Sequence, residues 1–183
     1  LAGNRDAIIE SIFGGKAQAI SGFTISSNLG YDDSIAPYEY DPEGAQALLT
    51  EAGYADGFEI SMGCPTDAYT NINEVCFALQ RDFFDIGVEM AVEFRTTNSF
   101  WAEPNYGTVG PMYVDSWSSA VGEALPRLEG ALIPGNYYNT WEDDTIITYI
   151  NDLRRTIERD ARAELYRDLQ QYMIDNPPFI YLY

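Results

Sequence analysis

The chain has 183 residues, of which 46% are hydrophobic and 21% charged, and this composition is typical of a globular protein with a sizeable core. With 29 acidic and 10 basic residues its net charge is −19, so we expect neither nucleic-acid binding nor attraction to anionic membranes, which both need clustered lysine and arginine. Histidine is absent, which removes the most common metal ligand and general base, and no apolar run reaches membrane-spanning length.

The first third of the chain is predicted to hold two helices, one over residues 4–13 and one beginning at Pro42. Between them, residues 16–40 lack periodicity and read as an irregular segment. Asp41 is a suitable N-cap for the second helix. Pro42 is tolerated at the first helical position, and Gly53 can end the helix. The apolar stripe of this helix comprises Ala45, Leu48, Leu49 and Ala52.

A strand, a helix and a strand follow with short connections. Apolar and polar residues alternate over 58–62 and again over 88–94, which predicts two half-buried strands. Residues 71–85 between them have helical periodicity, so the three elements form a βαβ unit with parallel strands. The predicted buried stripe of the helix comprises Ile72, Val75, Cys76, Leu79, Phe83 and Ile86.

The remaining elements are a short third strand at 112–114, a loop with a short helix over 115–140, two long helices and a last strand at 179–183. Asp143 or Asp144 is expected to cap the first long helix, and Asp160 the second. Their predicted interior residues are Ile146, Ile147, Ile150, Leu153, Ile157, Leu165, Leu169, Tyr172 and Met173. The fold class is therefore α/β, with a small mixed sheet and a βαβ core flanked by helices.

The sequence offers no recognisable catalytic arrangement. Nucleophilic catalysis by serine or cysteine normally needs a base such as histidine, and no phosphate-binding glycine loop follows a strand. Adjacent acids such as Asp32 and Asp33 are typical of turns and helix starts. We expect no enzyme activity, no cofactor and no metal, although the carboxylates leave an acidic glycosidase site open as an alternative.

Cys64 and Cys76 are the only cysteines. Two thiols alone do not make a zinc site. Either the two residues form a disulfide, as in many exported proteins, or Cys76 is a small core residue.

Several segments resemble one family in its expected order. The strongest is Tyr40-Asp41-Pro42-Glu43 with the helix and the Gly57-Phe58 that follow it. Residues 4–15, the turn at 85–88, Trp117 and the segment 177–183 add to the likeness. Together they resemble family 5 of the solute-binding proteins, which includes dipeptide, oligopeptide and nickel binders.

The resemblance implies a periplasmic-binding-protein-like lobe of type II. Residues 1–183 would be a single domain, the C-terminal ligand-binding lobe of a two-lobed protein whose N-terminal lobe is absent. The implied function is extracytoplasmic capture of an oligopeptide or peptide-like solute for an ABC importer. The implied location is periplasmic or lipid-anchored at the cell surface, and the implied partners are the missing lobe and a membrane permease, with the protein itself a monomer.

Two alternatives to peptide capture stay open. The lobe could bind a non-peptide solute, such as a glycoside, an opine-like compound or a metal chelate, or it could be an exported scaffold without transport. Peptide binders of the family often carry an Asp shortly after the Trp, but Ala120 and Glu123 stand at those positions. Some members also carry an Arg where this chain has Ala68, so a peptide held by both termini is in doubt.

Ligands of open α/β sheets bind at the carboxyl ends of strands, which selects the loops after the first and third strands. The resemblance points to the same loops. Tyrosine and tryptophan offer a flat apolar face with a polar tip, and a carboxylate can pair with a cationic group. Each main candidate also has a competing structural interpretation. Asp67 could be a plain turn residue, and Tyr69 could be an exposed loop tyrosine. Asp115 could cap the loop that follows it, and Trp117 could be a core residue. The candidate ligand-binding residues are Asp67, Tyr69, Asp115, Trp117 and Ser118, with Asn136 and Trp141 as weaker additions.

Overall fold

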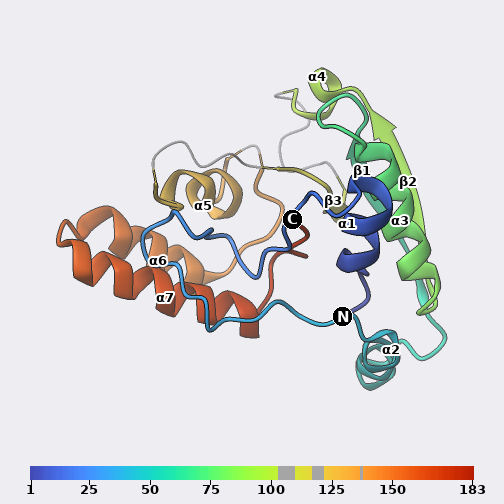
Figure 1. Ribbon diagram of the computed structural model, residues 1–183, viewed down its shortest axis with the longest axis horizontal. Helices are drawn as coiled ribbons and strands as arrows, with labels where there is room; N and C mark the ends of the chain where they lie inside the picture. The colour runs from blue at the N-terminus through green and yellow to red at the C-terminus, as the bar shows by residue number, and fades with distance from the viewer. Residues whose placement is uncertain (103–109, 117–121, 137) are drawn as a thin grey trace. The chain divides into compact units, whose positions relative to one another are not determined.

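The computed structural model describes residues 1–102, 110–116, 122–136 and 138–183. The chain divides into two compact units, and Figure 1 shows their helices and strands. Unit 1 comprises residues 1–19, 38–115 and 183, and unit 2 comprises residues 20–37 and 116–182. Unit 1 contains α1 (Arg5–Phe13), α2 (Pro42–Glu51), β1 (Phe58–Pro65), α3 (Ile72–Phe84), β2 (Val88–Arg95), α4 (Thr97–Phe100) and β3 (Met112–Tyr113). Unit 2 contains α5 (Leu125–Leu132), α6 (Asp144–Arg155) and α7 (Arg159–Asp175).

Unit 1 is built on a three-stranded sheet in the order β2-β1-β3. β1 pairs with β2 along its whole length, from Phe58 opposite Val88 to Pro65 opposite Arg95, and β3 pairs with Met62 and Gly63. The predicted βαβ unit is confirmed. Both pairings in the described residues are parallel, whereas the sequence pattern predicts a mixed sheet. The three strands therefore end at one common edge.

Helix α3 packs against β1 and β2 because its apolar residues recur at helical spacing (Figure 1). The buried members of this face are Ile72, Val75, Cys76 and Leu79, as predicted, while Phe83 is only partly buried. Cys76 forms a disulfide with Cys64 on β1, with a Cα–Cα distance of 6.5 Å, and both residues are fully buried. The bond closes a loop over 64–76, which includes two candidate ligand-binding residues.

The entries to β1 and β2 lie against each other at two glycines. Gly57 has a φ of +75°, and a Cβ added there would lie 1.8 Å from the carbonyl oxygen of Gly87. Only glycine fits such an approach of two backbones at a left-handed conformation. This contact lies where the register of the two strands begins.

Asp82 joins the start of the chain to α3. It is 6% exposed, and its Oδ2 accepts a hydrogen bond of 2.7 Å from the backbone N–H of Asn4. Burial raises the pKa of the Asp82 carboxyl above its usual range, although the Asn4 bond and the nearby Arg81 oppose the shift. A raised pKa in the folded state means that this carboxylate opposes folding when it is ionised.

Asp82→Asn is therefore expected to be at least as stable as the wild type at pH 7. The substitution removes the buried charge, and the amide oxygen can still accept the hydrogen bond from Asn4. The gain should shrink as the pH falls through the raised folded pKa, and it should vanish below the unfolded pKa, where wild-type Asp82 is itself neutral. Urea unfolding at several pH values measures this difference. The exposed Asp56→Asn in the same unit is the matched control, and a loss of stability in Asp82→Asn alone at pH 7 would contradict the expectation.

Unit 2 is a helical unit with one apolar core. Asp143 caps α6 by accepting hydrogen bonds from the N–H groups of Thr145 and Ile146. It is one of the two residues that were predicted as the cap of this helix. The core contains Phe23, Ala124, Leu128, Ala131, Leu132, Ile146, Ile150, Leu153, Tyr166, Leu169 and Met173. The segment 20–37, although far away in sequence, contributes to it through Phe23.

Helix α7 faces this core differently from the prediction. Its buried residues are Tyr166, Leu169, Gln170 and Met173, at ideal helical spacing, and Leu165 is only partly buried. The polar Gln170 concealed this stripe in the sequence, but its side-chain oxygen accepts a hydrogen bond from the buried Thr24 hydroxyl. The N-cap is Glu158 rather than the predicted Asp160.

Three other predictions on local structure are wrong. Ile157 is 94% exposed, because α6 ends at Arg155 before that residue can turn inward. Leu48 on α2 is 55% exposed, since α2 buries only Ala45. Residues 179–183 form no strand: Phe179 and Tyr181 instead pack their rings against the unit 2 core. Pro177 and Pro178 precede that segment and carry no N–H for a strand ladder.

Candidate functional site

The carboxyl edge of the parallel sheet brings together two of the predicted residues. The loop after β1 carries Tyr69, and Asp115 lies two residues beyond β3. The Tyr69 hydroxyl donates a hydrogen bond to Oδ1 of Asp115, 46 residues away in sequence. Tyr69 is 37% exposed and Asp115 is partly buried. A phenol and a carboxylate thus lie side by side at the edge where ligands of α/β sheets bind.

Asp67 holds this loop to the short helix α4. Its Oδ1 accepts hydrogen bonds from the backbone N–H and the hydroxyl of Thr97, at 2.5 and 2.6 Å. The Thr97 hydroxyl bond, followed by the backbone bond, holds the pKa of Asp67 below its usual range. Asp67 is therefore ionised at neutral pH and ties the loop after β1 to the helix after β2.

An aromatic cluster at the same edge is not among the residues predicted from the sequence. Phe100 in α4 is fully buried, and its ring lies 4.6 Å from that of Trp101 between centroids. Trp101 in turn lies 5.5 Å from Tyr113 in β3, nearly perpendicular to it. Burial, reinforced by Asp115, raises the pKa of the Tyr113 hydroxyl well above its usual range. The signal in the sequence was the presence of large aromatic residues just after the second strand and within the third.

Asn136 and Trp141 belong to unit 2. The Asn136 side-chain amide donates a hydrogen bond of 2.8 Å to the carbonyl of Glu129 in α5, so it supports the end of that helix. Trp141 is 40% exposed, and its carbonyl accepts a bond of 2.7 Å from the Asn139 side chain. The other two candidates, Trp117 and Ser118, lie outside the described residues.

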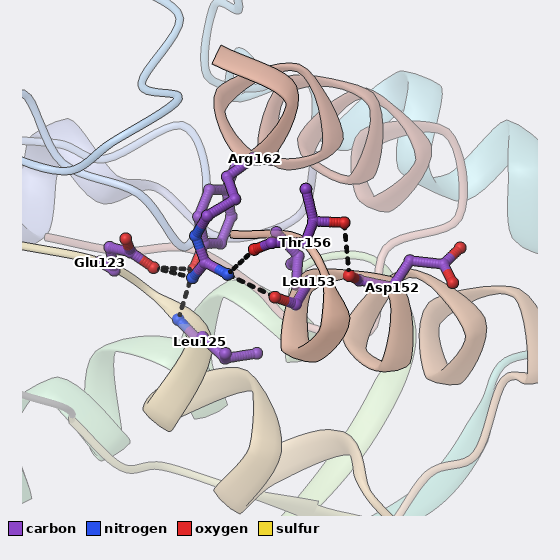
Figure 2. A network of polar contacts seen from close by, with 7 residues as sticks. Glu123, Leu125, Asp152, Leu153, Thr156 and Arg162 are labelled. Atoms are coloured by element: carbon purple, nitrogen blue, oxygen red, sulfur yellow. Dashed lines mark hydrogen bonds and ion pairs between the residues drawn. The ribbon is translucent and has the colours of Figure 1, made fainter. Parts of the chain in front are cut away.

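Glu123 stands at the second position where the resemblance expects an aspartate, and here it belongs to an internal network (Figure 2). Its Oε2 accepts hydrogen bonds from the guanidinium of Arg162 and, at 3.0 Å, from the hydroxyl of Tyr166. The same Tyr166 hydroxyl accepts a bond of 3.2 Å from the N–H of Leu125 at the start of α5. Tyr166 is fully buried, and the centre of the Arg162 guanidinium lies 5.9 Å from its ring.

Arg162 also binds the end of α6. Its Nη1 donates to the carbonyls of Leu153 and Thr156, the latter at 2.8 Å (Figure 2). Carbonyls at the last turn of a helix have no partner within the helix and carry its negative dipole, so a guanidinium suits this place. The Arg162 hydrogen bond holds the pKa of Glu123 below its usual range. The carboxylate of Glu123 is thus paired within unit 2.

No group of three or more metal-ligating side chains occurs within the described ranges. Within the same ranges, no helix is both long and apolar enough to span a lipid bilayer.

A family model described as bacterial extracellular solute-binding proteins, family 5 middle, matches residues 1–139. The chain is 29% identical to di/tripeptide-binding protein 1 of Pseudomonas aeruginosa (strain UCBPP-PA14) over 185 residues, which cover 97% of this chain and 34% of that protein. It is 28% identical to the dipeptide-binding protein of Escherichia coli K12 over 193 residues, which cover 96% of this chain and 34% of that protein. The chain therefore spans about a third of the length of these curated relatives.

Among solved structures, HbpA2 from Haemophilus parasuis matches with a TM-score of 0.87 and 24% identity. The match covers 98% of this chain and 37% of that one. The periplasmic binding protein DppA from Helicobacter pylori matches with a TM-score of 0.86 and 22% identity, over 99% of this chain and 36% of that one. These likenesses confirm the periplasmic-binding-protein fold that the resemblance implied.

Proposed function

Because this chain belongs to family 5 of the bacterial extracellular solute-binding proteins, we propose that it helps to capture a peptide or peptide-like solute for an ABC importer. The observation that carries the proposal is the likeness to proteins named for binding dipeptides and tripeptides, which extends over 96–97% of this chain. Those relatives are binding proteins, which supports a role without catalysis. Capture would take place outside the cytoplasm, in the periplasm or at the cell surface.

The proposed mechanism needs two lobes. Residues 1–183 would form the C-terminal lobe as a single domain, and a second lobe would close over the solute. Ligand binding favours a closed state when it gains contacts there that the open state lacks. The closed protein, as a monomer, would then dock on its membrane permease.

The proposed ligand contacts on this lobe are Asp67, Tyr69, Asp115, Trp117 and Ser118, with Asn136 and Trp141 as weaker members. The hydrogen bond between Tyr69 and Asp115 supports these two residues, since it joins the loop after β1 to the segment after β3 at the carboxyl edge of the sheet. The side-chain oxygens of the proposed contacts would bind the polar backbone of a peptide, and their aromatic rings would cover the side chains of the peptide.

A second candidate is capture of a non-peptide solute. The observation in its favour is that Glu123 is already bound by Arg162 and Tyr166. A carboxylate paired in this way has less to offer the amino group of a peptide. A sugar derivative, an opine-like compound or a metal chelate would not need that contact.

Full-length protein, purified without added ligand, is expected to retain a small peptide that native mass spectrometry detects and tandem fragmentation identifies. The chain of 183 residues is expected to bind the same peptide weakly or not at all in calorimetry, because one lobe provides about half of the contacts. Retention of a sugar, opine or chelate would support the second candidate. If the 183-residue chain alone bound the peptide with micromolar affinity, the two-lobe mechanism would be wrong.

A further inference from the structure

The residues at the carboxyl edge of the sheet are joined in one closed series of contacts. Asp67 binds Thr97, whose carbonyl accepts a backbone hydrogen bond of 3.0 Å from Trp101. The Trp101 ring contacts Tyr113, and Tyr113 is two residues before Asp115. Asp115 binds Tyr69, which returns the series to Asp67 two residues earlier. Three segments that are distant in sequence therefore hold one another in place.

Within this series, Trp101 is both accessible to solvent and held in place, as a residue that contacts a ligand should be. The indole is partly exposed, while its neighbour Phe100 is fully buried and supports it from within the unit. The Cys64–Cys76 disulfide closes the loop that carries Asp67 and Tyr69. A tryptophan held in this way loses little side-chain entropy when it binds a ligand.

We infer that Trp101 contacts the ligand beside the Tyr69–Asp115 pair and selects solutes that carry a planar apolar group, such as a peptide with an aromatic side chain. The inference rests on the proposed function, which it deepens by naming the class of side chain that is preferred. Tyr69 and Asp115 supply polar contacts to the ligand backbone, and the Trp101 ring supplies the apolar surface next to them. Aromatic pairs add affinity beyond the area that they bury, which gives such a site a preference among peptides.

The test compares two dipeptides, Ala-Phe and Ala-Ala, by calorimetry on the full-length protein after bound ligand has been removed. Wild type is expected to bind Ala-Phe about tenfold more tightly than Ala-Ala, the size of effect that one aromatic contact provides. Trp101→Ala should abolish this preference, because it should lower the affinity for Ala-Phe much more than the affinity for Ala-Ala. Trp101→Phe should restore part of the preference, which a purely structural role would not predict.

Phe84→Ala is the matched control, because Phe84 is an aromatic residue of the same unit that is 65% exposed and lies on α3. It should keep the wild-type preference. An unchanged preference for Ala-Phe in Trp101→Ala would overturn the inference, as would equal affinities of the wild type for the two dipeptides.

A second measurement separates this inference from the proposed function. In the double variant Trp117→Phe, Trp141→Phe, Trp101 is the only tryptophan left among the 183 residues, and acrylamide quenching reports whether a solute can reach its ring. If the wild type binds neither dipeptide, peptide capture is wrong. If acrylamide then quenches the Trp101 fluorescence, Trp101 stays a candidate contact for another planar solute. If acrylamide does not quench this fluorescence, Trp101 is excluded from any binding site.

Discussion

Replacing Arg162 by alanine is expected to lower the free energy of unfolding by about 2 kcal/mol, because the change removes hydrogen bonds between charged groups of a partly buried ion pair. Arg162 binds Glu123 and the carbonyls of Leu153 and Thr156, and only 15% of its side chain is exposed. Without the guanidinium, Glu123 keeps the Tyr166 hydroxyl but loses its countercharge, and the last carbonyls of α6 lose a donor. Urea unfolding followed by circular dichroism measures the change.

The chain offers a close control for this substitution. Arg155 is an exposed arginine in the last turn of α6, and Arg155→Ala should change the unfolding free energy by no more than about 0.5 kcal/mol, as surface substitutions usually do. Arg162→Lys should recover only part of the loss, because a single ammonium cannot match the fork of the guanidinium. Equal losses in Arg162→Ala and Arg155→Ala would show that the network in Figure 2 does not stabilise unit 2.

Removal of the disulfide is expected to have an effect of similar size. For the separation of 12 residues between Cys64 and Cys76, restriction of the unfolded chain predicts a loss of about 3 kcal/mol in the double variant Cys64→Ala, Cys76→Ala. Alanine is preferred to serine here because both positions are fully buried and a hydroxyl would need a partner. Urea unfolding of the oxidised wild type and the double variant measures the loss.

Reduction provides the control for this second prediction. Dithiothreitol should lower the stability of the wild type and leave that of the double variant unchanged. Because the bond closes the segment that carries Asp67 and Tyr69, the double variant should also lose affinity for any ligand bound at the carboxyl edge. A wild type whose stability does not respond to the reductant under unfolding conditions would contradict a stabilising role.

Most local elements of this protein can be predicted from its amino-acid sequence. Asp41 before Pro42 predicted where α2 begins, and Asp143 was one of two predicted caps for α6, because capping needs only residues within one turn. Alternation over 58–62 and 88–94 predicted β1 and β2, and the stripe from Ile72 to Leu79 predicted the buried face of α3. The family also followed from local segments, above all the helix that begins at Pro42, and the match over residues 1–139 confirms it.

Which distant side chains contact each other depends on the packing of the whole fold. Tyr69 and Asp115 are 46 residues apart, and Glu123 and Arg162 are 39 apart, so no local pattern could pair them. The cluster of Phe100, Trp101 and Tyr113 arises because β1, β2 and β3 end at one edge, which depends on strand order. Gln170 is buried because Thr24 reaches it from a distant segment, and Ile157 is exposed because α6 stops just before it. Periodicity and capping act over a few residues, whereas a binding edge or an ion pair depends on how distant elements pack.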